Sequence, residues 1–354
     1  MHVSILSEKL CQRGHKVIAL CAPSSELEKD LKRRSINVFP FSPWGYMDFS
    51  AIIKIKSILS KTHPDIIHAH YSKDLWAIAP AKHSSIPLIF VKHIGTQKPK
   101  LDAIHRWIYS RVNHTIAISK VIEKNLLETH PIPQEKICVV HHGVDLLQYD
   151  RHFENRKSVR QEFGIKDDEI LIGNIGRLQE GKGHLEFLDM AKKLSDRHKN
   201  IKFLIVGEPT RGEEFRAQVI LQKAKVLELQ EQVIFTGFRT DIPHILSAMD
   251  IFVFPSRAEA FGLVIIEAMA AGLPVISSNC DGVLDIIEQQ KNGILANPLD
   301  IDELVRSVEM LMTNRDLRQR LAHAGRKTVE QRFSLDSMAD KIENIYYKNI
   351  TTST

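Results

Sequence analysis

The sequence contains no hydrophobic run long enough to cross a membrane. Its longest apolar stretch, residues 262–276, is interrupted by Glu267, whereas a spanning helix needs roughly 20 apolar residues. The N-terminus also lacks the basic, apolar and small-residue segments of a signal peptide. With 43% hydrophobic and 26% charged residues, the chain has the composition of an ordinary globular protein. We therefore expect a cytoplasmic protein.

Cysteine is scarce, and the motifs of several common enzyme classes are missing. The four cysteines are widely spaced and form no CxxC pair, so we expect small, buried hydrophobic residues in a reducing compartment. There is no GxxxxGK[ST] loop and no GxGxxG after a first strand, which argues against a P-loop protein and a dinucleotide dehydrogenase. The Asp-x-Asp at Asp300 and Asp302 lies at a predicted helix start and is typical of an N-cap. We expect no metal site.

Charge is unevenly spread along the chain. Residues 1–147 contain 20 Lys and Arg against 12 Asp and Glu, whereas residues 148–354 contain 28 against 31. A basic first half suits an anionic partner such as a membrane surface, and a solvated face without a partner explains it equally well. Residues 98–111 combine basic and apolar side chains as a membrane-surface helix does, with a core-facing helix as the alternative. Nucleic-acid binding has only the charge in its favour, and we expect none.

The second half of the chain alternates short strands with helices. Strands are predicted over residues 170–176, 201–207, 232–237, 250–256 and 273–278. Helical patterns lie between them, at 184–197, 213–229 and 262–271. This alternation predicts a parallel sheet covered on both faces, a doubly wound α/β fold whose ligands bind beyond the carboxyl ends of the strands.

The first half repeats the alternation more faintly. Strands are predicted over residues 17–21, 37–39, 65–69, 88–92, 115–118 and 137–140. Helices are predicted over residues 46–61, 101–111 and 120–129, and the polar segment 141–160 predicts a linker. We therefore expect two Rossmann-like α/β domains, 1–147 and 148–334, facing each other across a cleft, and a C-terminal helix within 335–354 that packs against either one.

The start of the chain departs from the usual order of a doubly wound half. Val3, Leu6 and Leu10 recur at helical spacing, and Gly14 stands where a helix would end. Residues 17–21 are then the second strand of the usual order, and the first strand is missing. We expect the chain as given to be less stable and less active than a form with about 15 to 20 more N-terminal residues.

The strongest functional signal runs from Glu259 to Glu267. It follows a predicted strand and opens a helix at Gly262, where backbone N–H groups can meet a phosphate. Glu267 lies in a helix that is apolar nearly all round, and a lone carboxylate there is costly unless something bonds to it. A ribose diol would supply two hydroxyl donors, and a neighbouring basic side chain is the structural alternative.

Two cations follow the first strand of the second half. Arg177, directly after Gly176, and Lys182 lie in a Gly-rich turn that leads into a helix, and this arrangement suits a pyrophosphate. Taken alone the signal is weak, because basic residues are common in surface turns. Gly207 and Gly237 also end strands, where glycine serves either a tight turn or the close approach of a ligand.

In this order the motifs resemble those of the retaining glycosyltransferases often called family 4, which include sucrose synthase and have the GT-B fold. The matching segments of the second half are Gly176-Arg177-Leu178, Lys182-Gly183, Val206-Gly207, Phe235-Thr236-Gly237, Pro255-Ser256, Glu259 to Glu267, Ala271 to Ile276 and Asn292-Gly293. Those of the first half are Arg13 to Val17, Asp65 to His70 and Gly143-Val144-Asp145. The resemblance spans almost the whole chain. It departs at His142, where the family often has Asn, and at the missing first strand with its glycine-rich loop.

The resemblance implies a donor site and a residue close to the reacting sugar. The implied donor residues are Arg177 and Lys182 for the diphosphate, Glu267 for the ribose, and Glu259 with the backbone of Phe261, Gly262 and Leu263 for the transferred sugar and the phosphate. Gly176, Gly207 and Gly237 complete the set of substrate-binding positions. His93 matches the family's first-domain histidine near the reacting sugar, and a merely structural histidine is the alternative.

The implied activity is the transfer of a sugar from a nucleoside-diphosphate sugar to a glycan or a lipid-linked saccharide, in polysaccharide biosynthesis. Configuration at the anomeric carbon is retained, and no metal or other cofactor takes part, because cations and a helix N-terminus can stabilise the leaving diphosphate. The implied location is the cytoplasm or the inner face of the membrane. A nucleotide-sugar epimerase on the same fold and a non-catalytic, truncated homologue are the alternatives.

Overall fold

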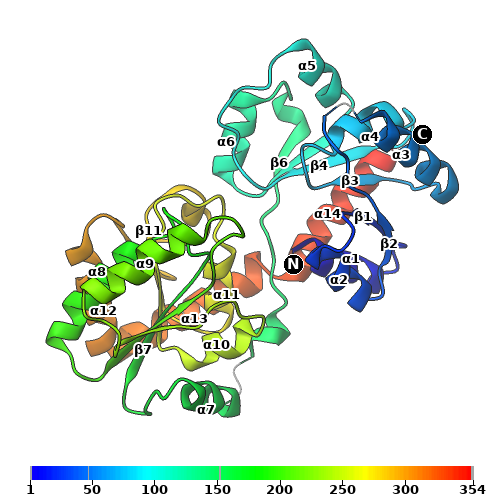
Figure 1. Cartoon of the computed structure of the whole chain (residues 1–354). Helices are drawn as coiled ribbons and strands as arrows, with labels where there is room; N and C mark the ends of the chain where they lie inside the picture. The colour runs from blue at the N-terminus through cyan, green and yellow to red at the C-terminus, as the bar shows by residue number, and fades with distance from the viewer. Residues whose placement is uncertain (1, 47, 151–152, 352–354) are drawn as a thin grey trace. The chain divides into compact units, whose positions relative to one another are not determined.

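The computed structural model describes residues 2–46, 48–150 and 153–351. The chain divides into two units, Met1–His142 with Leu335–Thr354, and Gly143–Ser334, called the first and the second unit below. In both units parallel strands are joined by helices (Figure 1). The predicted α/β class is confirmed.

The second unit contains one six-stranded sheet in the order β12-β11-β10-β7-β8-β9, in which all neighbours are parallel. Its strands are β7 (Ile170–Ile175), β8 (Ile201–Val206), β9 (Val233–Phe235), β10 (Ile251–Phe254), β11 (Val275–Ser278) and β12 (Ile294–Ala296). Strand β10 is buried over its whole length and β7 over nearly all of it, as expected for apolar runs covered on both faces. The order reverses between β7 and β10, and ligands of doubly wound sheets bind at such a point.

Helices cover both faces of this sheet. They are α7 (Phe153–Glu162), α8 (His184–Arg197), α9 (Glu214–Val226), α10 (Ile242–Ala248), α11 (Leu263–Ala270), α12 (Ile301–Thr313) and α13 (Arg315–Arg332). Helix α8 packs beside α9 and α12, α11 packs beside α13, and α7 packs beside α10. The three predicted helices are confirmed, two of them with small changes at their ends. The helix start predicted at Asp300 is also confirmed, because the Asp300 side chain caps α12 by accepting from the N–H of Glu303 at 2.9 Å. Strand β12 and helices α10 and α13 were not predicted.

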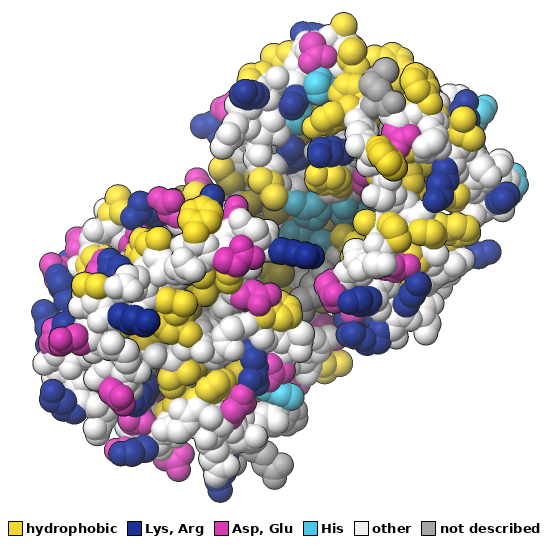
Figure 2. All heavy atoms as spheres, viewed as in Figure 1, with side chains coloured by type: hydrophobic (Ala, Val, Ile, Leu, Met, Phe, Trp, Pro, Cys, Tyr) yellow, Lys and Arg dark blue, Asp and Glu magenta, His cyan; other side chains and the backbone are white. Residues whose placement is uncertain are grey.

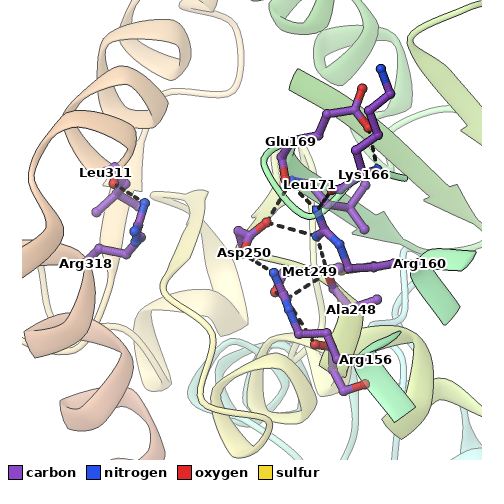
Figure 3. A network of polar contacts seen from close by, with 11 residues as sticks. Arg156, Arg160, Lys166, Glu169, Leu171, Ala248, Met249, Asp250, Leu311 and Arg318 are labelled. Carbon is purple, nitrogen blue, oxygen red and sulfur yellow. Dashed lines mark hydrogen bonds and ion pairs between the residues drawn. The ribbon is translucent and has the colours of Figure 1, made fainter. Parts of the chain in front are cut away.

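Helix α7 is fixed to the start of β10 through Asp250 (Figure 3). Arg156 donates to Oδ1 of Asp250 at 2.8 Å, and the buried Arg160 donates to Oδ2 at 3.4 Å. The same Oδ2 accepts from the backbone N–H of Leu171 at 2.9 Å. The interpretation of residues 141–160 as a linker is therefore wrong for its second part. Arg156 and Arg160 are four residues apart and lie on the same face of α7, and their bonds to Asp250 attach this helix to the second unit.

The first unit contains a four-stranded parallel sheet, β3-β4-β5-β6, and a two-stranded parallel sheet, β1-β2. The strands are β1 (Ile18–Cys21), β2 (Asn37–Pro40), β3 (Ile67–Ala69), β4 (Leu88–Lys92), β5 (His114–Ala117) and β6 (Ile137–Val139). All six were predicted, with slightly different ends. Within the described residues the two sheets are not hydrogen-bonded to each other. The missing first strand stays a prediction.

The helices of the first unit include the last one of the chain. They are α1 (His2–Gln12), α2 (Glu26–Arg33), α3 (Phe49–Thr62), α4 (Leu75–Ala81), α5 (Ala103–Ser110), α6 (Lys120–Thr129) and α14 (Leu335–Thr351). The helical start of the chain is confirmed, whereas α2 and α4 were not predicted. Helix α14 packs on α1, where Arg13 pairs with Asp340 and Glu343 at 2.5 Å each. Sequence alone left this helix free to join either unit, and these ion pairs hold it in the first.

The cysteines depart from the expectation at one position. All four cysteines are free thiols, but Cys11 is exposed, so the expectation of buried cysteines is wrong at that position. Of the helices in the described ranges, none combines the length and the hydropathy that crossing a bilayer requires.

Candidate functional site

Two loops meet at the point where the strand order of the second unit reverses. One follows β7 and runs from Gly176 to Gly183, and the other follows β10. Ser256 Oγ donates to the carbonyl oxygen of Gly181 at 3.0 Å, and the N–H of Arg257 donates to the same oxygen at 2.8 Å. A Cβ at Gly183, where φ is +79°, would lie 2.2 Å from the carbonyl oxygen of Pro255. Glycine is therefore required there for the two loops to pack.

Lys182 and Glu259, one from each loop, form an ion pair. Lys182 Nζ lies 2.6 Å from Glu259 Oε2, and the side chains are 22% and 14% exposed. The structure thus brings together two residues that the resemblance assigned to one site. The segment after β11 also fixes the β10 loop, because the N–H of Gly282 donates to the carbonyl oxygen of Glu259 at 2.9 Å.

Arg177 lies in the same β7 loop and is exposed. Its guanidinium takes part in no ion pair among the described residues, so it can meet an anionic ligand without losing a protein partner. Its backbone is fixed, because His184 Nε2 donates to the Arg177 carbonyl oxygen at 2.8 Å. His184 is buried at the start of α8. Sequence reasoning did not identify this supporting histidine.

Helix α11 begins at the β10 loop without a capping side chain. Its N-cap is Gly262, with φ +98°, and a residue without a side chain cannot bond the first backbone N–H groups of the helix. The preceding Phe261 is buried, and its ring packs edge-on against Phe333 at 5.8 Å between centroids. The N-terminus of α11, including Leu263, is therefore a fixed and partly positive surface next to Glu259.

Glu267 is paired with a tyrosine rather than with a cation. Tyr149 Oη donates to Glu267 Oε1 at 3.1 Å. Burial raises the pKa of Glu267 to about 7, and the bond from Tyr149 opposes this rise. Burial, followed by the nearby carboxylate, raises the pKa of Tyr149. The structural alternative of a basic partner is therefore wrong. Tyr149 was missed because it lies in η2 (Leu146–Tyr149), inside the segment interpreted as a linker.

The three strand-ending glycines have different roles. Gly207 has φ +140°, and a Cβ there would lie 2.0 Å from the carbonyl oxygen of Gly176. Its N–H donates to the carbonyl oxygen of Gly237 at 3.0 Å. At Gly237, φ is +71° and a Cβ would meet nothing within 4 Å. Gly207 is thus required by the packing of β8 against the β7 loop, and Gly237 by a turn.

In the first unit, His93 lies among other histidines at the strand ends. It follows β4, and its Nε2 lies 3.2 Å from Nδ1 of His70, which follows β3. The ring of His142 stacks on it at 5.4 Å. Burial, and then the charge of Lys92, lowers the pKa of His93 to about 4. His93 is therefore neutral at pH 7 and can both donate and accept a hydrogen bond.

Two further histidines extend this cluster. His2 of α1 lies 3.0 Å from His142 between Nε2 and Nδ1, and Nδ1 of His68 lies 2.5 Å from the Tyr346 hydroxyl of α14. Burial lowers the pKa of His142 and of His68 to about 3. Within the described ranges, no three His, Cys, Asp or Glu side chains are arranged to hold a metal ion. Of this cluster, the sequence identified only His93 as functional.

Comparisons with known proteins agree with the motifs. The family model "Glycosyl transferases group 1" matches residues 155–328, and "Glycosyltransferase Family 4" matches residues 1–147. An uncharacterized glycosyltransferase of Methanocaldococcus jannaschii is 27% identical, over 98% of this chain and 93% of its own length. A galactosyltransferase of Escherichia coli that acts on GlcNAc-diphosphoundecaprenol is 26% identical, over 84% of this chain and 79% of its own length.

The structure is also similar to solved glycosyltransferase structures. The crystal structure of Anabaena HepE in complex with UDP and glucose superposes with a TM-score of 0.85 at 22% identity, covering 97% of this chain and 94% of that one. That likeness shows a shared GT-B fold. The family models, which match residues 1–147 and 155–328, show that the chain is a glycosyltransferase of the group 1 and family 4 kind.

Proposed function

We propose that the chain transfers a sugar from a nucleoside-diphosphate sugar to a saccharide or lipid-linked acceptor, with retention of configuration and without a metal. The observation that carries the proposal is the Lys182–Glu259 pair, with 2.6 Å between Nζ and Oε2, between the two loops at the switch point of the sheet. A cation there serves the leaving diphosphate, and a carboxylate serves the hydroxyls of a sugar.

The donor diphosphate takes its charge stabilisation from three groups in this proposal. Arg177 and Lys182 supply two positive charges, and the N-terminus of α11 at Gly262 supplies backbone N–H groups and the positive end of the helix dipole. When the anomeric C–O bond breaks, the electron pair leaves with the diphosphate, and these groups stabilise the charge that develops. Lys182 is held by Glu259 and the N-terminus of α11 is fixed before the substrate binds, and together with the exposed Arg177 they can take the place of a metal ion.

The ribose of the donor is assigned to Glu267. The bond from Tyr149 occupies one of the two carboxylate oxygens, which leaves acceptor capacity for a ribose hydroxyl. The uridine nucleotide in the HepE structure supports uridine diphosphate sugars as the first donors to test.

His93 is assigned to the reacting sugar. As a neutral imidazole it can accept a hydrogen bond from a sugar hydroxyl or donate one to it, and His70 fixes its ring through the 3.2 Å contact. The acceptor hydroxyl forms the new bond to the anomeric carbon, and its proton passes to the departing diphosphate oxygen. Retention rests on the resemblance to family 4.

The setting of the reaction is also a proposal. The Escherichia coli relative acts on a diphosphoundecaprenol-linked saccharide, which supports a role in polysaccharide biosynthesis. The four free thiols suit a reducing compartment such as the cytoplasm. The comparisons favour transfer over the alternative of an epimerase, since the relatives named above are glycosyltransferases.

A thermal-shift screen against nucleoside diphosphates and their sugars tests the donor site. A ligand at 100 times its Kd stabilises the folded state by about 2.7 kcal/mol, and one nucleotide should raise the melting temperature of the wild type and not of Lys182→Ala. If the uridine, guanosine and adenosine diphosphates and their sugars all fail to shift the wild type, the proposed donor site is wrong. An epimerase would release the epimerised nucleotide sugar without any acceptor.

A further inference from the structure

Several large apolar side chains of the first unit are exposed to solvent and are not part of its core. Six of them come from the segment before and inside α3 and from the start of α5: Trp44, Phe49, Ile53, Leu101, Ile104 and Trp107. Trp44 is 99% exposed, Phe49 69% and Ile53 68%. These six residues are called the aromatic surface below. Exposed apolar groups of this size mark interaction sites.

The two halves of the aromatic surface are linked by a chain of rings. Tyr46 lies 5.1 Å from Trp76 of α4 between ring centroids, and Trp76 lies 5.3 Å from His105 of α5. Helix α4 packs against both α3 and α5. In Figure 2 hydrophobic side chains gather over the upper part of this unit, with Lys and Arg side chains between and beside them. The segments that carry the six residues are therefore packed beside one another through α4.

Helix α5 shows that this exposure is built into the fold. Ile108 and Tyr109 are buried and attach the helix to the unit, while Ile104 is 54% exposed and Trp107 50% exposed. The helix is capped by Asp102, whose side chain accepts from the N–H of His105 at 3.1 Å. Its outward apolar side chains are thus held on an ordered helix rather than on a loose end. The expectation of a core-facing helix is correct for only part of its apolar side chains.

The charge around the aromatic surface is almost all of one sign. Residues 41–111 contain ten Lys and Arg, four Asp and no Glu. Asp48 and Asp102 are used as helix caps, and burial raises the pKa of Asp74 to about 6. Among the described residues, no Lys or Arg of this range takes part in an ion pair. Lys82 and Lys92 are buried. The charge that is available to an outside anion comes from the exposed side chains Lys54, Lys56, Lys61, Lys73, Lys98 and Arg106.

We propose that the aromatic surface docks on an anionic lipid bilayer and that the acceptor is lipid-linked. Tryptophan, present twice in the aromatic surface, is favoured at the membrane interface, and the surrounding exposed Lys and Arg side chains can meet lipid phosphates. Residues 94–102 join His93 to α5, so the surface begins at the same end of β4 as the residue assigned to the sugar. Docking would bring a membrane-held saccharide to that strand end. The identity of the acceptor rests on the proposed function, whereas the docking does not.

The test is co-sedimentation of the full chain with vesicles at 50 mM and 500 mM salt. We expect binding to vesicles that contain 30% phosphatidylglycerol, weak binding to pure phosphatidylcholine, and loss of binding at high salt. The double variant Lys98→Gln/Lys100→Gln should bind roughly 25-fold more weakly, at about fivefold per removed charge. Ile104→Ser/Trp107→Ser should bind at least tenfold more weakly. The matched control is Phe215→Ser/Val226→Ser, which removes two exposed apolar side chains of α9 in the second unit and should bind like the wild type.

Several outcomes would overturn the docking proposal. These are no binding to anionic vesicles at low salt, equal binding to both lipids, or equal loss in the α9 control. A dimer in sedimentation velocity that Trp107→Ser dissolves would assign the surface to a second copy instead. Nucleotide binding by the wild type separates the two proposals. If the nucleotide binds and vesicles do not, docking is wrong and the donor site stands; the reverse result removes the donor site and leaves the docking.

Discussion

The raised pKa of Glu267 predicts how donor binding depends on pH. A ribose hydroxyl donates to the ionised carboxylate and loses most of that bond when the acid is protonated. With a pKa of about 7, the carboxyl is mostly ionised at pH 8 and protonated roughly ten to one at pH 6. The Kd for a nucleotide sugar should therefore be about tenfold higher at pH 6 than at pH 8.

The assay is calorimetric titration between pH 5.5 and 8.5 with an intact nucleotide sugar, because a free diphosphate has a phosphate group that titrates in the same range. Glu267→Gln should bind more weakly at pH 8 and show no such pH dependence. Tyr149→Phe should move the midpoint upward, since the bond from Tyr149 opposes the rise in pKa. A flat profile in the wild type, or the same slope in Glu267→Gln, would refute the assignment of Glu267 to the ribose.

Three further predictions concern the stability contribution of Glu267, the two cations proposed to bind the diphosphate, and the ion pairs of Asp250. Because the folded-state pKa of Glu267 lies above its unfolded value of 4.5, its contribution to stability is present at pH 4 and is lost as the pH rises through 7; the wild type should lose roughly 3 kcal/mol relative to Glu267→Gln in urea unfolding across that window. Arg177→Ala and Lys182→Ala should each lower turnover by about 10² or more, and turnover within threefold of the wild type in both would place the diphosphate elsewhere. Asp250→Ala leaves Arg156 and the buried Arg160 without their carboxylate and should cost about 3 to 5 kcal/mol, whereas a change below about 1 kcal/mol would show that the backbone carbonyls suffice.

Most of the fold could be predicted from local patterns. The run Ile201–Val206 is apolar except at Lys202, and half of its residues are β-branched, so a buried strand follows from the run itself. The same holds for the helix over His184–Arg197, whose apolar spacing fixes both ends closely. Helix α4 escaped prediction because Pro80 lies inside it and it spans only seven residues.

The residues proposed for the donor site could be predicted as a set, but their spatial arrangement could not. Lys182 and Glu259 are 77 residues apart, and only the reversal of strand order between β7 and β10 makes them neighbours. Tyr149 gave no signal, because its role depends on the distant Glu267. The histidine cluster has the same cause: His2, His70 and His142 meet only after α1 and two strand ends assemble. Gly207 could not be assigned until the carbonyl of Gly176 was seen beside it.

Metal-independent transfer from a nucleoside-diphosphate sugar, as proposed above, can be measured directly. The direct measurement supplies radiolabelled UDP-sugars and a lipid-linked saccharide acceptor, with EDTA present, and follows label in the acceptor together with the anomeric configuration of the new bond. We expect label transfer that EDTA does not reduce, an axial glycosidic bond from a donor with an axial anomeric bond, and at least a hundredfold lower rate in Lys182→Ala. Transfer that stops in EDTA and returns with added metal, or an inverted product, would contradict it.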